Sequence, residues 1–172
     1  MVDKYLARDA GKTGQKTPVT ASAGTSDAGK ILALDSSGKI DPTVLPDGVG
    51  ANVNTAVAAE NLSAGAFVNL FNDGGTFSAR LADNSNGRAA DGFVLVAVAS
   101  AASASVYPLG ELNSGLSSLT VGAEYWLGTV GGVIATPLDE TSTSNAGYLS
   151  QFLGKAKSAT EMITVRDEAV TL

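Results

Sequence analysis

Carboxylates are the main side chains in this sequence that can do acid–base chemistry, because its 172 residues include neither histidine nor cysteine. That absence excludes Ser-His-Asp and Cys-His nucleophiles, imidazole or thiolate metal sites and disulfide bonds. Adjacent acids occur at Asp139-Glu140 and Asp167-Glu168. A glycosidase needs two carboxylates facing one sugar about 5–10 Å apart, whereas neighbouring side chains in a strand or loop point apart. We therefore predict a solvated acidic surface, no catalytic residue and no enzyme; a carboxylate-based glycan hydrolase remains an alternative.

The run Asp83-Asn84-Ser85-Asn86-Gly87 partly resembles a calcium-binding loop. An EF-hand loop would need Gly at its sixth place and Glu at its twelfth, but these places hold Arg88 and Val94. Asn, Asp and Ser also form turns, because their side chains bond to nearby backbone. We predict a turn here, and no metal or cofactor site in the chain.

The net charge belongs to one part of the chain. Residues 1–50 hold six basic and six acidic residues, so the net charge of −6 lies wholly in residues 51–172. Nucleic-acid-binding proteins carry a basic patch, and this sequence has none. The longest uncharged run, Gly92–Gly110, fits two buried strands at Phe93–Ala99 and Ser103–Leu109 better than a membrane span. We predict no nucleic-acid partner, no membrane partner and no small-molecule substrate.

Residues 51–172 contain an internal duplication. The segment Leu62–Ala79 matches Leu119–Thr136 at an offset of 57 residues, and Phe93–Val106 matches Phe152–Val165 at an offset of 59. The two halves run from about residue 60 to 110 and from 117 to 172.

Each half is typical of β structure. Strand-like runs flank a glycine pair, Gly74-Gly75 or Gly131-Gly132, and such pairs supply the positive φ of tight hairpin turns. The sequence predicts an all-β fold, a small β-barrel or β-sandwich built from two similar halves of about 55 residues. One barrel or two small ones are both compatible with it. A helix is expected only at Asn54–Asn61, whose middle is rich in alanine.

The aromatic residues lie mainly in the strand-like runs. Phe93 and Trp126 are expected to pack in the core. An aromatic platform for a sugar or a nucleobase is the alternative.

Residues 1–50 are predicted to form an extended N-terminal arm with a short β-hairpin, because large apolar residues are sparse between Ala7 and Gly29. A floppy terminus is the alternative. The hairpin is placed at a strand over Lys30–Leu34, a turn at 35–38 and a second short strand. Pro42 and Pro46 then keep the exit extended.

Two parts of the sequence resemble tailed-phage virion proteins. The segment AGKILALDSSGKIDPTVLP, Ala28 to Pro46, resembles a stretch near the N-termini of decoration proteins and tail fibres. The globular part resembles phage head-decoration, or capsid cement, proteins in the segments Leu62–Phe71, Asp91–Ala99, Ser118–Leu127, Gly131–Pro137 and Gly154–Thr160. It departs from them in a longer arm and in the polar stretch Leu138–Leu149.

The resemblance implies a mechanical role. Cement proteins form trimers on the outer capsid surface, where arms reach across neighbouring major capsid subunits. A protein of this kind is made in the host cytoplasm and ends in the virion. A tail-fibre, baseplate or spike component that contacts the host surface is the alternative.

An arm with little structure of its own can order on binding, and a strand at 30–34 could add to an exposed sheet edge of the partner. The candidate apolar anchors are Tyr5, Leu6, Ile31, Leu32, Leu34, Ile40, Val44 and Leu45. The alternative for each is packing against its own domain.

Overall fold

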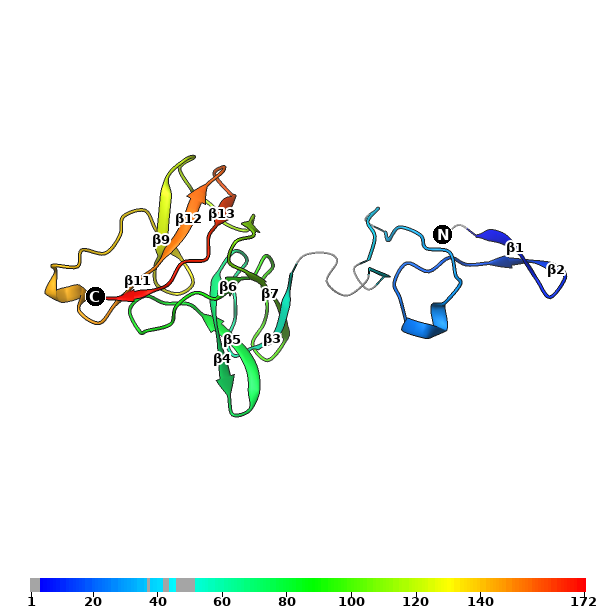
Figure 1. Cartoon of the computed structure of the whole chain (residues 1–172), viewed down its shortest axis with the longest axis horizontal. Coiled ribbons are helices and arrows are strands. Elements are labelled where there is room, and N and C mark those ends of the chain that lie inside the picture. The colour runs from blue at the N-terminus through cyan, green and yellow to red at the C-terminus, as the bar shows by residue number, and fades with distance from the viewer. Residues whose placement is uncertain (1–3, 37, 42–43, 46–51) are drawn as a thin grey trace. The chain divides into compact units, whose positions relative to one another are not determined.

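The computed structural model describes residues 4–36, 38–41, 44–45 and 52–172. The chain divides into two compact units, Met1–Ala51 and Asn52–Leu172 (Figure 1). Strands are the main regular elements of the described residues, and helical structure is confined to short 3-10 segments such as η1 (Gly24–Asp27) and η3 (Thr143–Asn145). The prediction of an all-β fold is confirmed.

The first half of the second unit is a closed five-stranded barrel. Its strands are β3 (Asn54–Ala58), β4 (Phe67–Asp73), β5 (Thr76–Leu81), β6 (Gly92–Phe93) and β7 (Ser103–Pro108). They pair in the order β3-β5-β4-β6-β7, with β7 returning to β3. The parallel β3–β5 pairing closes the barrel, while the other pairs are antiparallel. Small and β-branched side chains fill it, including Ala56, Val68, Ala79 and Val106.

The second half repeats this strand order as an open sheet. Its strands are β8 (Leu112–Asn113), β9 (Glu124–Leu127), β10 (Val133–Ile134), β12 (Phe152–Ala156) and β13 (Met162–Thr164). They pair in the order β10-β9-β12-β13-β8, which is the order of β5-β4-β6-β7-β3 in the barrel. The edges β10 and β8 do not pair with each other as β5 and β3 do. The duplication in the sequence is therefore also present in the topology.

The first half bonds to the second sheet near its two open edges. The N–H of Phe67 donates to the carbonyl of Gly131 at 2.9 Å, and the Gly131 N–H donates to Ala82 at 2.6 Å. The buried Asn113 of β8 donates from Nδ2 to the carbonyl of Gly65 at 2.9 Å. One core spans this junction, with Phe67 and Phe93 from the first half and Tyr125, Leu127, Leu153 and Met162 from the second. The two halves form one body through this core.

The last strand of the second unit belongs to a short antiparallel pair. Strand β11 (Leu149–Ser150) pairs antiparallel with β14 (Val170–Thr171). The N–H of Leu149 also donates to the carbonyl of Asn84 at 2.7 Å, which ties this pair to the first half.

The glycine pairs behave differently in the two halves. Gly74 and Gly75 both have positive φ, 59° and 96°, as predicted for the turn between β4 and β5. In the second half the residues with positive φ are Val130 (54°) and Gly131 (71°), so the turn lies one residue earlier than predicted.

Two secondary-structure predictions fail in this unit, one of a helix and one of the length of a strand. Asn54–Ala58 is strand β3 rather than a helix, because Ala56 and Ala58 point into the barrel while Val57 between them points out. That period of two is the strand pattern, and the barrel interior selects small side chains at those positions. The strand predicted at Phe93–Ala99 is confined to β6, whereas the one at Ser103–Leu109 is β7.

The first unit has a hairpin at a place that the sequence did not predict. Strands β1 (Tyr5–Asp9) and β2 (Lys12–Lys16) pair antiparallel around Ala10 and Gly11, whose φ values of 47° and 81° are those of a two-residue hairpin turn. The strand predicted at Lys30–Leu34 is wrong, because this segment makes only an isolated parallel bridge between Val19 and Leu32.

The turn after that segment is present. The Gly38 N–H donates to the carbonyl of Asp35 at 3.0 Å, and Gly38 has a φ of 72°. Pro42 and Pro46, expected to keep the exit extended, lie outside the described residues.

Candidate functional site

The first unit contains no core in its described part. From Lys4 to Leu45, every residue whose burial the structure describes is exposed or half-buried. Among the candidate anchors, Tyr5, Val44 and Leu45 are half-buried. The other five are exposed, at fractions between 42% for Leu32 and 73% for Leu6; the remaining three are Ile31, Leu34 and Ile40. A two-stranded hairpin without a buried face is marginal in water. The five exposed anchors are left largely uncovered by the residues that the structure describes.

Two of the anchors meet in a small hollow of about 230 Å³ within this unit. Val19, Leu32 and Val44 supply its apolar lining. Asp27 and Lys30 lie at the same hollow, and their 2.6 Å ion pair lowers the pKa of Asp27 below its ordinary value. The hollow thus combines an apolar lining with an ion pair.

The first predicted acid pair belongs to a turn. Asp139 Oδ1 accepts hydrogen bonds from the Thr141 hydroxyl at 2.7 Å and from the Thr141 N–H at 2.9 Å. The hydroxyl bond is the larger cause of a lowered pKa for Asp139. This carboxylate is therefore engaged in local structure, and Glu140 beside it is exposed.

The run that resembles a calcium loop forms a turn, as predicted. Asp83 and Arg88 bond to each other's backbone across the turn. Asp83 Oδ1 accepts the Ser85 hydroxyl and N–H at 2.6 and 2.8 Å, and its Oδ2 accepts the N–H of Val130 in the second half at 3.1 Å. Burial alone would raise the pKa of Asp83, but these bonds and the charge of Arg88 together lower it. The turn joins the two halves.

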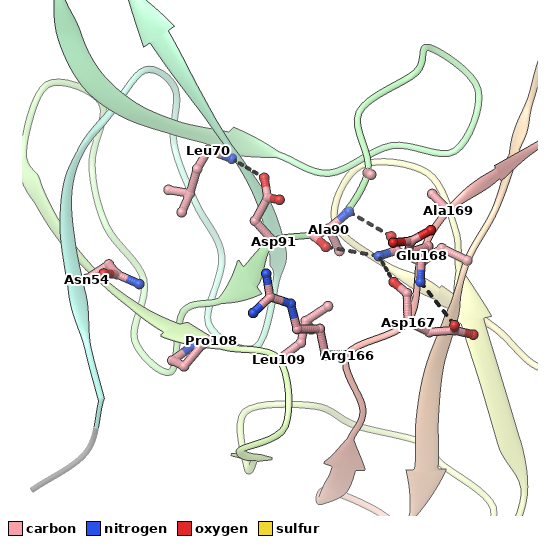
Figure 2. A pocket seen from close by; sticks show the side chains of 12 residues that line it. Asn54, Leu70, Ala90, Asp91, Pro108, Leu109, Arg166, Asp167, Glu168 and Ala169 are labelled. Atoms are coloured by element: carbon pink, nitrogen blue, oxygen red, sulfur yellow. Dashed lines mark hydrogen bonds between the residues drawn. The ribbon is translucent and has the colours of Figure 1, made fainter.

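The second acid pair lines a groove of about 650 Å³ where the two halves meet. The first half contributes Asn54, Leu70, Ala89, Ala90, Asp91, Pro108 and Leu109, and the second half contributes Gln151, Arg166, Asp167, Glu168 and Ala169. Figure 2 shows the Arg166 guanidinium reaching into the space between Asp91 and Pro108. The groove thus combines one cation, three carboxylates and an apolar wall.

Gln151 holds the two walls of the groove together. It is 3% exposed, accepts the Ala90 N–H at 2.8 Å, and donates to the carbonyls of Ala90 and Asp167 at 3.0 and 3.1 Å (Figure 2). Asp91, next to Ala90, is held on the other side. Its Oδ2 accepts the N–H of Leu70 at 2.7 Å and the side-chain amide of Asn69 at 3.1 Å. These bonds fix the position of the Asp91 carboxylate.

Arg166 makes no ion pair with any residue that the structure describes. Its guanidinium is exposed, as is the Glu168 carboxylate two residues later. Sequence reasoning singled out the pair Asp167-Glu168 but missed Arg166, Asp91 and Gln151. A signal for Gln151 was present, since it is a lone amide between Leu149 and the apolar residues Phe152 and Leu153.

The aromatic residues divide between core and surface. Phe93 is fully buried, with its ring stacked 5.7 Å from Tyr107 and edge-on to Phe67 at 6.1 Å, so its core role is confirmed. Trp126 is only half-buried, and its ring lies 5.5 Å from that of Phe152.

No helix among the described residues is long and apolar enough to cross a membrane. Nor do three or more acidic side chains gather in that part of the chain in a way that could hold a metal ion.

No protein-family model matches the chain, and no curated protein matches it in sequence. Among solved structures, it is similar to the head fiber gp8.5 N base of bacteriophage phi29. The similarity covers 69% of this chain and 98% of that one, at 16% identity and a TM-score of 0.46. At these values the likeness carries no argument about function.

Proposed function

We propose that the chain is a structural protein of a tailed-phage virion that binds major capsid subunits on the outer capsid surface and stabilises the shell. The carrying observation is the first unit, in which none of the residues with described burial is buried and five of the eight apolar anchors are exposed. The phage partner itself rests on the resemblance of Ala28–Pro46 and of the β domain to decoration proteins.

In this proposal the β domain folds by itself and the arm attaches the protein to the capsid. Residues 52–172 hold the buried cores, so they fold around their own side chains. The arm has to bury Leu6, Ile31 and Leu34 elsewhere, and each such side chain contributes about 1.5–3 kcal/mol when it becomes fully buried. Ordering the arm opposes this gain, so several anchors must act together. The same resemblance supports a trimer as the bound form, and the proposal assigns no catalytic step to the chain.

The test uses capsids that lack this protein and a full-length triple variant, Leu6→Ser, Ile31→Ser and Leu34→Ser. We expect it to lose co-sedimentation with capsids while its thermal unfolding stays that of the natural chain. The matched control replaces three exposed valines of the β domain, Val121, Val130 and Val170, by serine and should still bind. Capsid binding by the arm variant would refute the anchor role.

Localisation separates the capsid role from the tail-fibre alternative. Cryo-electron microscopy of the intact virion should show this chain over the icosahedral head. Density at the tail alone would overturn the capsid assignment and leave a role in host contact.

A further inference from the structure

We propose that the groove between the two halves binds an acidic saccharide, a hydroxylated ring that bears a carboxylate. Its volume of about 650 Å³ lies within the range of ligand sites, about 300–1,000 Å³. The inference concerns the β domain and does not depend on capsid attachment. It departs from the expectation, drawn from composition, that the chain binds no small molecule.

The guanidinium of Arg166 supplies the anion-binding group. It reaches into the groove and has no ion pair within the described chain (Figure 2). The carboxylate of Asp91 is already engaged, since its Oδ2 accepts two hydrogen bonds. A planar guanidinium matches a carboxylate with two parallel hydrogen bonds. A ligand carboxylate would supply the ion-pair partner that Arg166 does not find among the described residues.

The remaining polar groups of the groove can accept hydrogen bonds from a ligand, and further negative charge would not satisfy them. Asp91 Oδ1 and the Glu168 carboxylate accept no hydrogen bond from any described residue, and an ionised carboxylate can only accept. Sugar hydroxyls are donors of this kind. The amide of Asn54, on the same groove, can donate to a ring oxygen or a hydroxyl.

The charge of the groove excludes the simpler partners. Three carboxylates, those of Asp91, Asp167 and Glu168, repel a peptide that carries an acid at every position. A basic peptide would suit them but would meet the unpaired charge of Arg166. One carboxylate among several hydroxyls satisfies both sets of groups. The apolar wall, formed by Leu70, Pro108, Leu109 and Ala169, suits the C–H face of a sugar ring.

The experiment is isothermal titration calorimetry of the full chain with cellobiouronate, a disaccharide with a single carboxylate, as the acidic probe. Cellobiose is the matched neutral probe and triglutamate the peptide probe. We expect binding of cellobiouronate in preference to both. Arg166→Gln should weaken it about 10- to 100-fold, the loss typical of a hydrogen-bonded charge pair. Glu168→Gln, which keeps the shape of the side chain but loses its charge, should weaken it less.

Lys155→Gln is the matched control. It removes the same charge from an exposed side chain in the same half, one paired with Glu124 and not part of the groove lining, so binding should be unchanged. Equal losses in the Lys155 and Arg166 variants would overturn the proposal, because the effect would then be one of net charge. So would equal affinity for cellobiose, tighter binding of triglutamate, or no heat with any probe at millimolar concentration.

Discussion

Two repeat-equivalent glycines allow the junction between the halves to be measured. Gly65 and Gly122 each occupy the third place of a four-residue turn, with φ values of 77° and 80°. Each turn is closed by the same bond, Ala66 N–H to Ser63 at 3.1 Å in the first and Ala123 N–H to Thr120 at 3.0 Å in the second. Their surroundings differ. A Cβ at Gly65 would collide with the backbone of Gly115, whereas one at Gly122 would meet nothing within 4 Å.

The Gly122→Ala variant should therefore lose only the cost of a left-handed conformation, about 1 kcal/mol. Gly65→Ala has this cost and must also displace Gly115, with about 1–3 kcal/mol of overpacking. Displacement strains the bond from Asn113 to the Gly65 carbonyl, and an unsatisfied buried group costs about 1–3 kcal/mol more. We expect a total loss of about 3–7 kcal/mol for Gly65→Ala.

Urea unfolding, followed by the fluorescence of the single tryptophan, Trp126, gives both free energies. Far-UV circular dichroism checks that the slopes with denaturant agree. If the two alanine variants lose the same free energy within about 0.5 kcal/mol, close packing of Gly65 against Gly115 is refuted.

Two further predictions concern the polar groups of the junction. Gln151→Met keeps the volume of the side chain but removes three hydrogen bonds, so it should lower the free energy of unfolding by about 2–5 kcal/mol. Gln15→Met, at an exposed site on β2, should change this free energy little. Equal effects of the two variants in urea unfolding would refute the role of Gln151 in holding the two walls of the groove together. The lowered pKa of Asp83 means that its stabilising contribution is present above the ordinary carboxyl range, about pH 4, and is lost as pH falls through the lower folded value. Asp83→Asn should thus be less stable at pH 7 but lose less stability on acidification, and identical pH profiles of the urea midpoint would contradict this.

The sequence predicted what depends on local pattern and on repetition. The glycine pair at 74–75 identified a hairpin because positive φ at two adjacent residues is a local requirement. The duplication predicted two similar halves, and the strand orders of the two halves agree.

What failed depended on the surroundings of a segment. Alanine in Asn54–Ala58 suggested a helix, but the barrel interior needs small residues at alternate positions. The hairpin at Tyr5–Lys16 was missed because its strands are only five residues long and β2 is polar and exposed throughout, with no alternation of apolar and polar residues to detect.

The groove could not be predicted because it depends on a structural difference between the two halves. The second sheet stays open between β10 and β8, and Gly131 and Asn113, beside and on these edge strands, bond to Gly65, Phe67 and Ala82 of the first half. This docking brings Asp91 beside Arg166 across the junction.

The duplication does not repeat these groove residues. At the offset of 59, Asp91 corresponds to Ser150 and Arg166 to Tyr107. The groove residues of one half therefore have no matching residues in the other half. The two halves share a topology but together form a single asymmetric site. The proposed saccharide should accordingly bind once per chain, and a stoichiometry of two would place binding elsewhere.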